Sequence, residues 1–410
     1  MKKDKILTGL NISSSQITCV VCSVNDKSTI RVLGSASSKA KGVEKGAISD
    51  LNEVASSIAE AVDKAESTAR TKVVSLIANC DGPNIRTYNA KGTITIADKE
   101  NEITKRDIER VIEAARTIAL PFDRKIIHCV VRGFILDGQE GIKDPIRMYG
   151  MRLEVDMQIV AGLITNMQNI TRAINTAGFE IEDIVLTGVA AGVVTLEELE
   201  KDLGVILIYI SQSTTHIVIY SAGEIKSIEV LPTGSGNFID AISVRCRIPR
   251  EYAEDIIKRN ASLDRAAATD DEEINLRIGG LRRTLSKASI FDAIEPKAKD
   301  LISHIADRLK NLPFARESAA GCVVTGELSN LGGFLEKMEL SLNMPVRMGL
   351  AKGFLGESTV ITNPDYFACL GLVKYWHDEG LKRKVKRDNF GNSPIGKLLR
   401  KARDILSDYF

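Results

Sequence analysis

Apolar positions at the start of the chain follow first a strand period and then a helix period. Apolar and β-branched residues run from Ile6 to Ile12, which predicts a strand, and from Ile17 to Leu33 around a short polar turn, which predicts a hairpin. From Leu51 to Ala69 apolar residues recur at helical spacing, and Asp50 or Ser49 is placed to cap that helix. The chain therefore opens with an α/β unit.

The middle of the chain mixes strands with helices. Four segments carry the apolar pattern of strands: Val73 to Asn79, Asn84 to Ile96, Lys125 to Leu136 and Arg152 to Val160. Helical spacing predicts one helix from Thr104 to Ile118 and another from Asn166 to Ala177, and a further strand follows from Ile181 to Leu186.

The second half repeats the order of the first. Three consecutive strands are predicted at Gly204 to Ile210, Thr215 to Tyr220 and Glu224 to Leu231, and helices at Asn237 to Val244 and Arg250 to Asn260. The pattern then predicts one long helix from Leu281 to Leu312, a strand from Cys322 to Leu328 and a helix that starts after Leu331. Two halves of this kind imply two lobes with a ligand cleft between them.

The last residues of the chain are predicted to form an amphipathic helix. Ser393 and Pro394 supply an N-cap and a proline for its first turn. Apolar residues recur on one face: Ile395, Leu398, Leu399, Ala402, Ile405, Leu406, Tyr409 and Phe410. The opposite face carries the basic residues Lys397, Arg400, Lys401 and Arg403. Such a helix suits an anionic membrane surface, where each basic residue contributes about 1 kcal/mol.

The same periodicity also fits a helix that docks on the protein's own body or on a partner helix. We favour the membrane because this helix is terminal and follows a basic segment, Leu381 to Phe390, that we expect to be a flexible linker.

Composition and charge limit the classes of protein to which this chain can belong. The chain has 410 residues, of which 44% are hydrophobic and 27% charged, as in a globular protein of several structural units. Its apolar runs are shorter than the roughly 20 residues of a membrane span, and its start lacks the pattern of a secretory signal, so we expect a cytoplasmic protein. Residues 381–410 hold nine basic and three acidic residues, a net charge of +6 that leaves −5 on the rest. The tail should therefore have its own partner, and the acidic body argues against nucleic-acid binding.

The cysteines and histidines offer little metal chemistry. Cys19 and Cys22 have the spacing of a redox or metal pair, but they lie in a predicted strand, where residues three apart face opposite sides. We favour buried thiols in a reducing compartment. The four histidines do not cluster at metal-ligand spacing, so no metal site is expected.

Several motifs resemble the actin-like ATPase superfamily and, within it, the bacterial cell-division family FtsA. Residues 9–15, 209–216 and 323–327 stand where the superfamily has its first phosphate loop, its second phosphate loop and its adenosine loop. The closer similarity to FtsA rests on residues 42–50, on residues 139–146 with 150–154, and on Pro345-Val346-Arg347. These motifs occur in the family's order over residues 6–375.

The resemblance implies an α/β fold with two actin-like lobes, each of the ribonuclease-H-like type, with a small inserted α+β module and a C-terminal amphipathic helix. The implied parts are the first lobe at residues 1–84 and 161–196, completed by 355–377; the inserted subunit-contact module at 85–160; the second lobe at 197–245 and 313–354; a helical subdomain over the cleft at 246–312; a basic linker at 378–391; and the membrane-targeting helix at 392–410.

The phosphate loops depart from the superfamily pattern. Glycines there let backbone N–H groups approach phosphates, and aspartates organise Mg²⁺ and the attacking water. In this chain Asn11 and Ser13 replace an acid and a glycine of the first loop. Tyr209 and His216 replace both acids of the second loop, and residues 211–213 replace its glycines. Polar side chains that can still bond to phosphate are Asn11, Ser13, Ser14, Ser15, Ser211, Ser213, Thr214 and Thr215.

The adenosine side matches the family better. Thr325, Gly326 and Glu327 occupy its loop, and Glu254 and Lys258 match a Glu and a Lys that touch ribose and base. The alternative for that pair is an ordinary i,i+4 ion pair. Gly236 and Asn237 could contact phosphate, or Asn237 could cap the next helix. We expect ATP to bind weakly or not at all and its hydrolysis to be inefficient. The sequence leaves open whether Mg²⁺ binds.

The resemblance implies a cell-division scaffold that self-associates peripherally on the cytoplasmic face of the bacterial cell membrane, at the division site. Residues 392–410 would tether the tubulin-like protein FtsZ to the membrane, with anionic lipids and other division proteins as further partners and no nucleic acid. Two alternatives stay open: an active ATPase that drives filament turnover, and an actin-like adaptor of a pilus or secretion system, which would usually lack the terminal helix.

Overall fold

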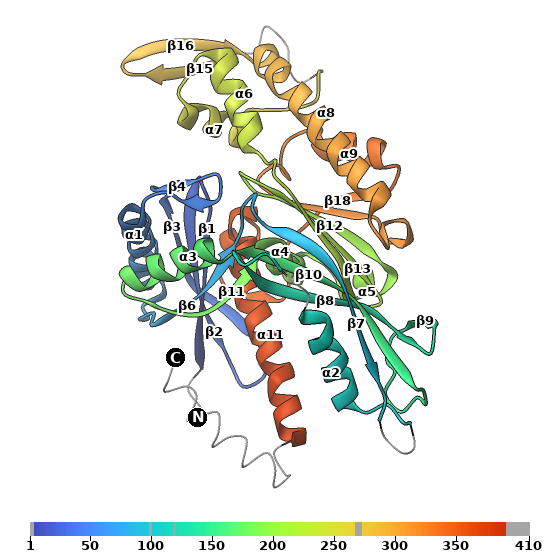
Figure 1. Cartoon of the computed structure of the whole chain (residues 1–410). Coiled ribbons are helices and arrows are strands. Elements are labelled where there is room, and N and C mark those ends of the chain that lie inside the picture. Colours follow the sequence, from blue (N-terminus) through green and yellow to red (C-terminus); the bar gives the residue numbers. More distant parts are fainter. Residues whose placement is uncertain (1–3, 98–100, 118–119, 267–272, 391–410) are drawn as a thin grey trace.

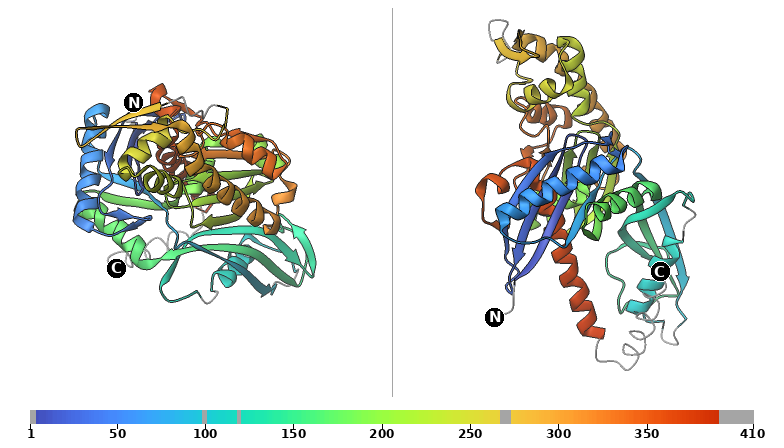
Figure 2. Two further views of the ribbon diagram at one scale, coloured as in Figure 1. Left: turned by 90° about the horizontal axis from the view of Figure 1, so that it is seen from above. Right: turned by 90° about the vertical axis from the view of Figure 1, so that its left-hand side faces the viewer.

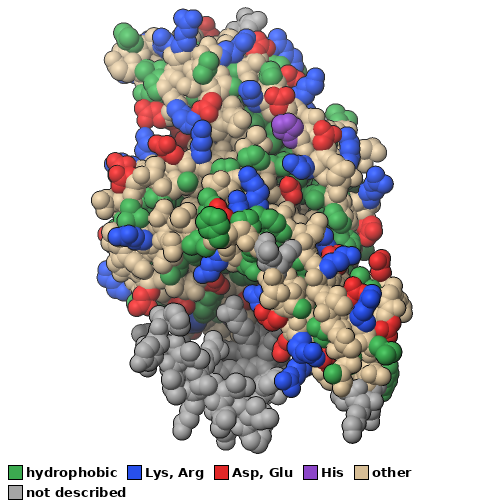
Figure 3. All heavy atoms as spheres, in the orientation of Figure 1, with side chains coloured by type: hydrophobic (Ala, Val, Ile, Leu, Met, Phe, Trp, Pro, Cys, Tyr) green, Lys and Arg blue, Asp and Glu red, His purple; other side chains and the backbone are tan. Residues whose placement is uncertain are grey.

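The computed structural model describes residues 4–97, 101–117, 120–266 and 273–390 (Figure 1). Two mixed sheets form two lobes, a third sheet with one helix lies beside them, and a group of helices stands at one end of the molecule (Figures 1 and 2). On the face shown in Figure 3, acidic and basic side chains are interspersed, so neither sign of charge dominates that face.

The first lobe is a six-stranded sheet in the order β11-β6-β1-β2-β3-β19. Its strands are β1 (Lys5–Ile12), β2 (Gln16–Val24), β3 (Ile30–Lys39), β6 (Ser75–Cys80), β11 (Glu180–Leu186) and β19 (Phe354–Leu355). The short strands β4 (Val43–Glu44) and β5 (Ala47–Ile48) pair before α1 (Leu51–Ala69), which packs with α3 (Ile164–Thr176) on one face of the sheet. Asp50 caps α1, accepting bonds from the N–H groups of Asn52 and Glu53. The predicted strand, hairpin and helix are thus confirmed.

Cys19 and Cys22 lie on opposite faces of β2. Cys19 joins the core under α1, whereas Cys22 joins the core under α11 (Phe367–Phe390), and both side chains are fully buried. The prediction of buried thiols is confirmed, because residues of opposite faces cannot share a metal or a disulfide.

The second lobe is a five-stranded sheet in the order β14-β13-β12-β17-β18. Its strands are β12 (Val205–Ile210), β13 (Thr215–Ser221), β14 (Glu224–Leu231), β17 (Cys322–Gly326) and β18 (Val346–Met348). The three predicted consecutive strands and the later strand are confirmed. Three shorter elements border this sheet: α5 (Glu198–Leu203), η1 (Ala315–Glu317) and α9 (Phe334–Leu342). Two others, α10 (Ser358–Ile361) and η2 (Pro364–Tyr366), pack against the core of the first lobe.

Two helices, α4 (Thr187–Thr195) and α11, lie between the two sheets (Figure 1). They approach so closely that a Cβ at Gly371 would overlap the carbonyl oxygen of Ala190. Likewise, a Cβ at Gly9 of β1 would overlap the carbonyl oxygen of Cys369. Glycines therefore set the distance between the lobes. Helix α4 was not predicted from the sequence pattern.

The inserted module is a four-stranded sheet in the order β7-β10-β8-β9 with α2 (Lys105–Arg116) on one face. Its strands are β7 (Arg86–Thr95), β8 (Arg124–Leu136), β9 (Gln139–Ile142) and β10 (Arg152–Leu163). Thr104 and Asp107 form a capping box at the start of α2. The module has its own hydrophobic core, and β8 lies against β14 of the second lobe.

The helical subdomain corrects one prediction. It contains α6 (Gly236–Cys246), α7 (Arg250–Arg259), the hairpin of β15 (Glu273–Ile278) and β16 (Leu281–Ser286), and α8 (Lys287–Asn311). The single helix predicted from Leu281 to Leu312 is wrong over its first six residues, which form β16. Gly279 and Gly280 both have positive φ and turn the chain back, and Ser286 caps α8 only after β16 ends.

The C-terminal region corrects a second prediction. The flexible linker expected from Leu381 to Phe390 is wrong, because α11 continues as a helix through Phe390. This segment is rich in lysine and arginine, which are good helix formers, and it contains neither glycine nor proline. The predicted amphipathic helix at residues 392–410, with all of its lipid-facing and basic residues, lies outside the described residues. Within the described part of the chain, no helix is long and apolar enough to span a membrane.

Candidate functional site

Three loops meet where the two lobes face each other. The first joins β1 to β2 and holds Ser13 to Ser15, the second joins β12 to β13 and holds Gln212 to Thr214, and the third follows β17 at Gly326. β12 and β17 are parallel neighbours, with Ile210 opposite Gly326, so the second and third loops leave the same edge of the sheet. Loops at the ends of such strands are the usual place for a ligand site.

Serine side chains bridge the first and second loops. The Ser14 and Ser213 hydroxyl oxygens lie 3.2 Å apart, and Ser14 also accepts a bond of 2.9 Å from the N–H of Gly46. Ser15 donates a bond of 3.4 Å to a carboxylate oxygen of Glu327 in the third loop. The sequence therefore predicted a set of residues that the fold does bring together.

A buried acid and a histidine form the tightest contact of the site. Asp81 follows β6 of the first lobe, and its Oδ1 lies 2.8 Å from Nε2 of His216 on β13 of the second lobe. Thr214 donates a hydrogen bond to the same carboxylate oxygen. The His216 side chain is fully buried and that of Asp81 is 9% exposed. The sequence did not point to Asp81, and His216 was considered only as the replacement of an acid of the second phosphate loop.

The surroundings of Asp81 keep its carboxyl ionised. Burial by itself would raise its pKa, but the charge of His216 and hydrogen bonds from His216, Thr214 and Ser211 outweigh burial and lower the pKa to about 2. Asp81 is therefore a carboxylate at every physiological pH, held by groups of the opposite lobe.

Glu327 is the second buried carboxyl of the site. It accepts a hydrogen bond from Ser235, and burial raises its pKa to about 7, although Ser235 and the charge of Lys258 act in the opposite direction. Lys258 forms an ion pair of 3.1 Å with Glu254. Burial would lower the pKa of Lys258, but Asp365, Glu254 and Glu327 raise it. The predicted adenosine pair is thus an i,i+4 ion pair that also faces Glu327 and Asp365.

The raised pKa of Glu327 predicts a pH-dependent stability. A carboxyl group whose pKa is higher in the folded state binds a proton on folding, so stability should fall as pH rises from about 4.5 through about 7. Glu327→Gln should remove this loss and be more stable than the wild type at pH 8 by about 1–3 kcal/mol, with little difference near pH 5. Urea unfolding between pH 5 and pH 8 measures this. The exposed Glu336→Gln on α9 is the control, and a Glu327→Gln protein less stable than the wild type at pH 8 would contradict the prediction.

The remaining predicted residues take other positions. Asn237 is exposed on α6, where Ser235 occupies the N-cap position, so of the two roles considered for Asn237 the helix cap is excluded. Gly236 donates its N–H to the carbonyl of Gln212, and Thr215 bonds to the carbonyl of Thr233. The buried Thr325 hydroxyl has no hydrogen-bond partner within the described part of the chain.

Little space is left between the loops. The cavity there measures about 10 Å³, which holds at most one water molecule. Its lining side chains are mostly polar: Asn11, Ser13, Gln16, Asp81, Tyr209, Ser211, Glu327, Pro364 and Asp365, with Gly326. Three of these are carboxyl groups, and the side chains of the described residues include no group of three or more His, Cys, Asp or Glu placed to hold a metal ion. A cavity of this size is too small for a nucleoside triphosphate.

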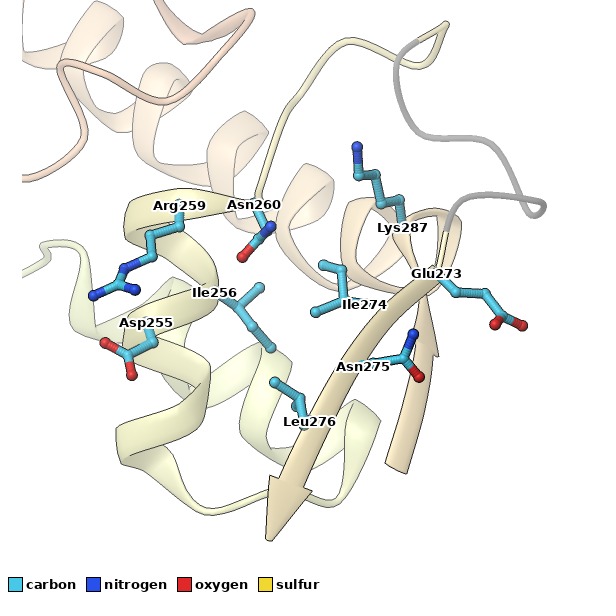
Figure 4. A pocket seen from close by; sticks show the side chains of 9 residues that line it. All are labelled: Asp255, Ile256, Arg259, Asn260, Glu273, Ile274, Asn275, Leu276 and Lys287. Carbon is cyan, nitrogen blue, oxygen red and sulfur yellow. The ribbon is translucent and has the colours of Figure 1, made fainter. Parts of the chain in front are cut away.

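A larger hollow lies away from the three loops. It measures about 600 Å³ and opens between α7 and β15 (Figure 4). Asp255 and Arg259 line it from α7, and Glu273 and Asn275 from β15. Charges of both signs line this hollow, and no residue predicted from the sequence for a site is among its lining residues.

Two family models match the chain. One, described as the SHS2 domain inserted in FTSA, matches residues 82–161. The other, described as Cell division protein FtsA, matches residues 206–371. The first match coincides with the inserted module, and the second covers the second lobe and the helical subdomain.

Whole-chain comparisons agree with these matches. The cell division protein FtsA of Pseudomonas aeruginosa is 31% identical over 96% of this chain and 95% of its own length. Among solved structures, the PilM-PilN type IV pilus biogenesis complex contains a chain with a TM-score of 0.67 at 16% identity, covering 90% of this chain and 98% of that one. MreB5 of Spiroplasma citri bound to ADP has a TM-score of 0.51 at 13% identity, with coverages of 95% and 99%. At such identities the structures show the fold alone, and it is the predicted actin-like fold.

Proposed function

Because the chain belongs to the FtsA family of actin-like cell-division proteins, we propose that it tethers the FtsZ ring to the cytoplasmic face of the cell membrane. It would self-associate there, at the division site, with anionic lipids and other division proteins as further partners. The single observation that carries the tether is the amphipathic pattern of residues 392–410.

The course of α11 supports this proposal. The helix begins between the two sheets and runs out of the body on the side away from the helical subdomain (Figures 1 and 2). It reaches Phe390, and the amphipathic segment begins within the next few residues. A rigid helix of this kind would carry a membrane-binding segment away from the lobes, which leaves the rest of the surface for partners.

The tether is tested by co-sedimentation with vesicles that contain phosphatidylglycerol. Removal of residues 392–410 should abolish binding, and Leu398→Glu with Leu406→Glu should weaken it strongly, because both changes remove apolar area from the membrane-facing side. The matched control is Leu340→Glu, a change of an exposed leucine on α9 that should leave binding as in the wild type.

Two results would contradict the tether. One is unchanged co-sedimentation of the shortened chain. The other is equal binding to vesicles of phosphatidylcholine alone, because the basic face of the segment requires anionic lipid.

We further propose that ATP binds weakly or not at all and that the protein is not an efficient ATPase. The supports are the small cavity between the loops and the replacement of both acids of the second phosphate loop by Tyr209 and His216. Steady Mg²⁺-dependent release of phosphate from ATP by the purified protein would favour the alternative, an ATPase whose turnover drives filament turnover.

A further inference from the structure

Side chains of the two lobes bond directly to each other where the loops meet. The contacts join Ser14 to Ser213, Ser15 to Glu327, and Asp81 to both Thr214 and His216. We call these seven residues the interlobe lock. In each contact one member belongs to the first lobe and the other to the second, so the contacts exist only when the lobes are closed on each other.

We propose that the interlobe lock holds the two lobes together in place of a bound nucleotide. A ligand between the lobes would join them by contacting the loops of both, and here the side chains of those loops contact each other instead. The closed arrangement would then form without any ligand. This inference does not depend on the membrane tether, because its residues lie outside positions 392–410 of the sequence; it deepens the proposal that ATP binds weakly or not at all.

The pair of Asp81 and His216 is the strongest part of the lock. A hydrogen bond between a carboxylate and a buried ring is stronger than the same bond in water, because the surroundings screen it less. The ring of His216 is also fixed in place: a Cβ at Gly188, at the start of α4, would lie only 2.6 Å from the His216 Cβ. Tyr209 packs edge-on against the ring with centroids 5.9 Å apart. Separation of the lobes would therefore leave Asp81 with the N–H of Gly82 but without its bonds to His216 and Thr214 of the other lobe.

The charge of the site opposes phosphate. Asp81, Glu327 and Asp365 all line the cavity, and the nearby Lys258 already pairs with Glu254. A phosphate group brought between the loops would meet carboxyl groups and would have to break the serine contacts to enter. The residues that join the lobes therefore also exclude a nucleotide from the space between the loops.

A disulfide trap tests the lock. Ser14→Cys combined with Ser213→Cys places two thiols where two hydroxyl oxygens lie 3.2 Å apart. The native cysteines are buried except the half-buried Cys129, which is replaced by serine in all variants. Under mild oxidation of the nucleotide-free protein, the disulfide should form readily, and added Mg²⁺-ATP should leave its rate unchanged within about twofold. Each single cysteine variant should form no internal disulfide.

A lock variant and its control complete the test. Asp81→Asn in the trap protein should slow disulfide formation about tenfold, since a hydrogen bond to a charged group is lost. The control Asp107→Asn alters a buried aspartate of the α2 capping box, outside the lock, and should leave the rate unchanged. A second trap, Ser15→Cys with Glu327→Cys, tests whether the first trap reports closure of the lobes rather than a change confined to its own two loops.

Three outcomes would overturn the lock. They are disulfide formation that requires ATP, the absence of a disulfide in both traps with and without ATP, and an Asp81→Asn trap protein that forms its disulfide as fast as the trap protein with Asp81. Far-UV circular dichroism of each variant before oxidation distinguishes a folded protein with open lobes from one that has lost its fold. Because these readouts do not involve lipid, failure of the lock and failure of the membrane tether are separate results.

Discussion

Replacing Asp81 by alanine should lower the free energy of unfolding by about 3–5 kcal/mol, because His216 would lose the carboxylate that pairs with it in the protein interior. His216→Ala should cost a similar amount, since Asp81 would then be a buried carboxylate with fewer partners. In the double variant neither group is left unpaired, so its loss should be smaller than the sum of the two single losses by about 1–3 kcal/mol. Urea unfolding of the four proteins measures this cycle.

The pH dependence of the same four proteins adds an independent readout. The pKa of Asp81 is lowered from 3.8 to about 2 by His216 and the neighbouring hydroxyls, against the effect of burial. The stabilisation that it contributes should therefore be complete above about pH 4 and be lost as pH falls toward about 2. Proteins without Asp81 should lack this part of the acid transition. The exposed Glu336→Gln on α9 is the control, and an Asp81→Ala loss below about 1 kcal/mol would contradict the assignment.

The periodic patterns of the chain predicted most of its regular elements. The strands at the start of each lobe appear where the pattern places them, because their continuous apolar runs are buried on both faces of the sheet. Helix α1 with its Asp50 cap also appears as predicted, because its apolar residues lie on the one face that packs on the sheet. Where the pattern failed, the deciding feature was local. The turn at Gly279 and Gly280 converts the start of a predicted helix into β16, and the absence of a helix breaker before residue 391 extends α11.

The candidate site was predicted in part. The serines of both loops were identified through their motif positions, and the fold does bring them together. Asp81 was missed because its role depends on His216, 135 positions away. A signal did exist: Asp81 directly follows a buried strand, and the carboxyl end of such a strand is a common site position. Only the three-dimensional arrangement reveals that His216 has gained a partner rather than merely replaced an acid.

Gly371→Ala should destabilise the protein by about 1–3 kcal/mol, although alanine favours helices over glycine. The added Cβ would overlap the carbonyl oxygen of Ala190, a backbone atom of α4 that cannot turn aside as a side chain could. The two helices would have to move apart. Since α4 and α11 lie between the two sheets, this movement would also disturb the contact of the lobes.

A second glycine of the same helix provides the matched comparison. Gly380 also lies in α11, but a Cβ there would meet no atom within 4 Å, so Gly380→Ala should stabilise the protein by about 0.5–1 kcal/mol through helix propensity. Urea unfolding of both variants should thus give shifts of opposite sign for the same chemical change. If Gly371→Ala were as stable as Gly380→Ala, the close approach of α4 and α11 would not govern how the lobes are held.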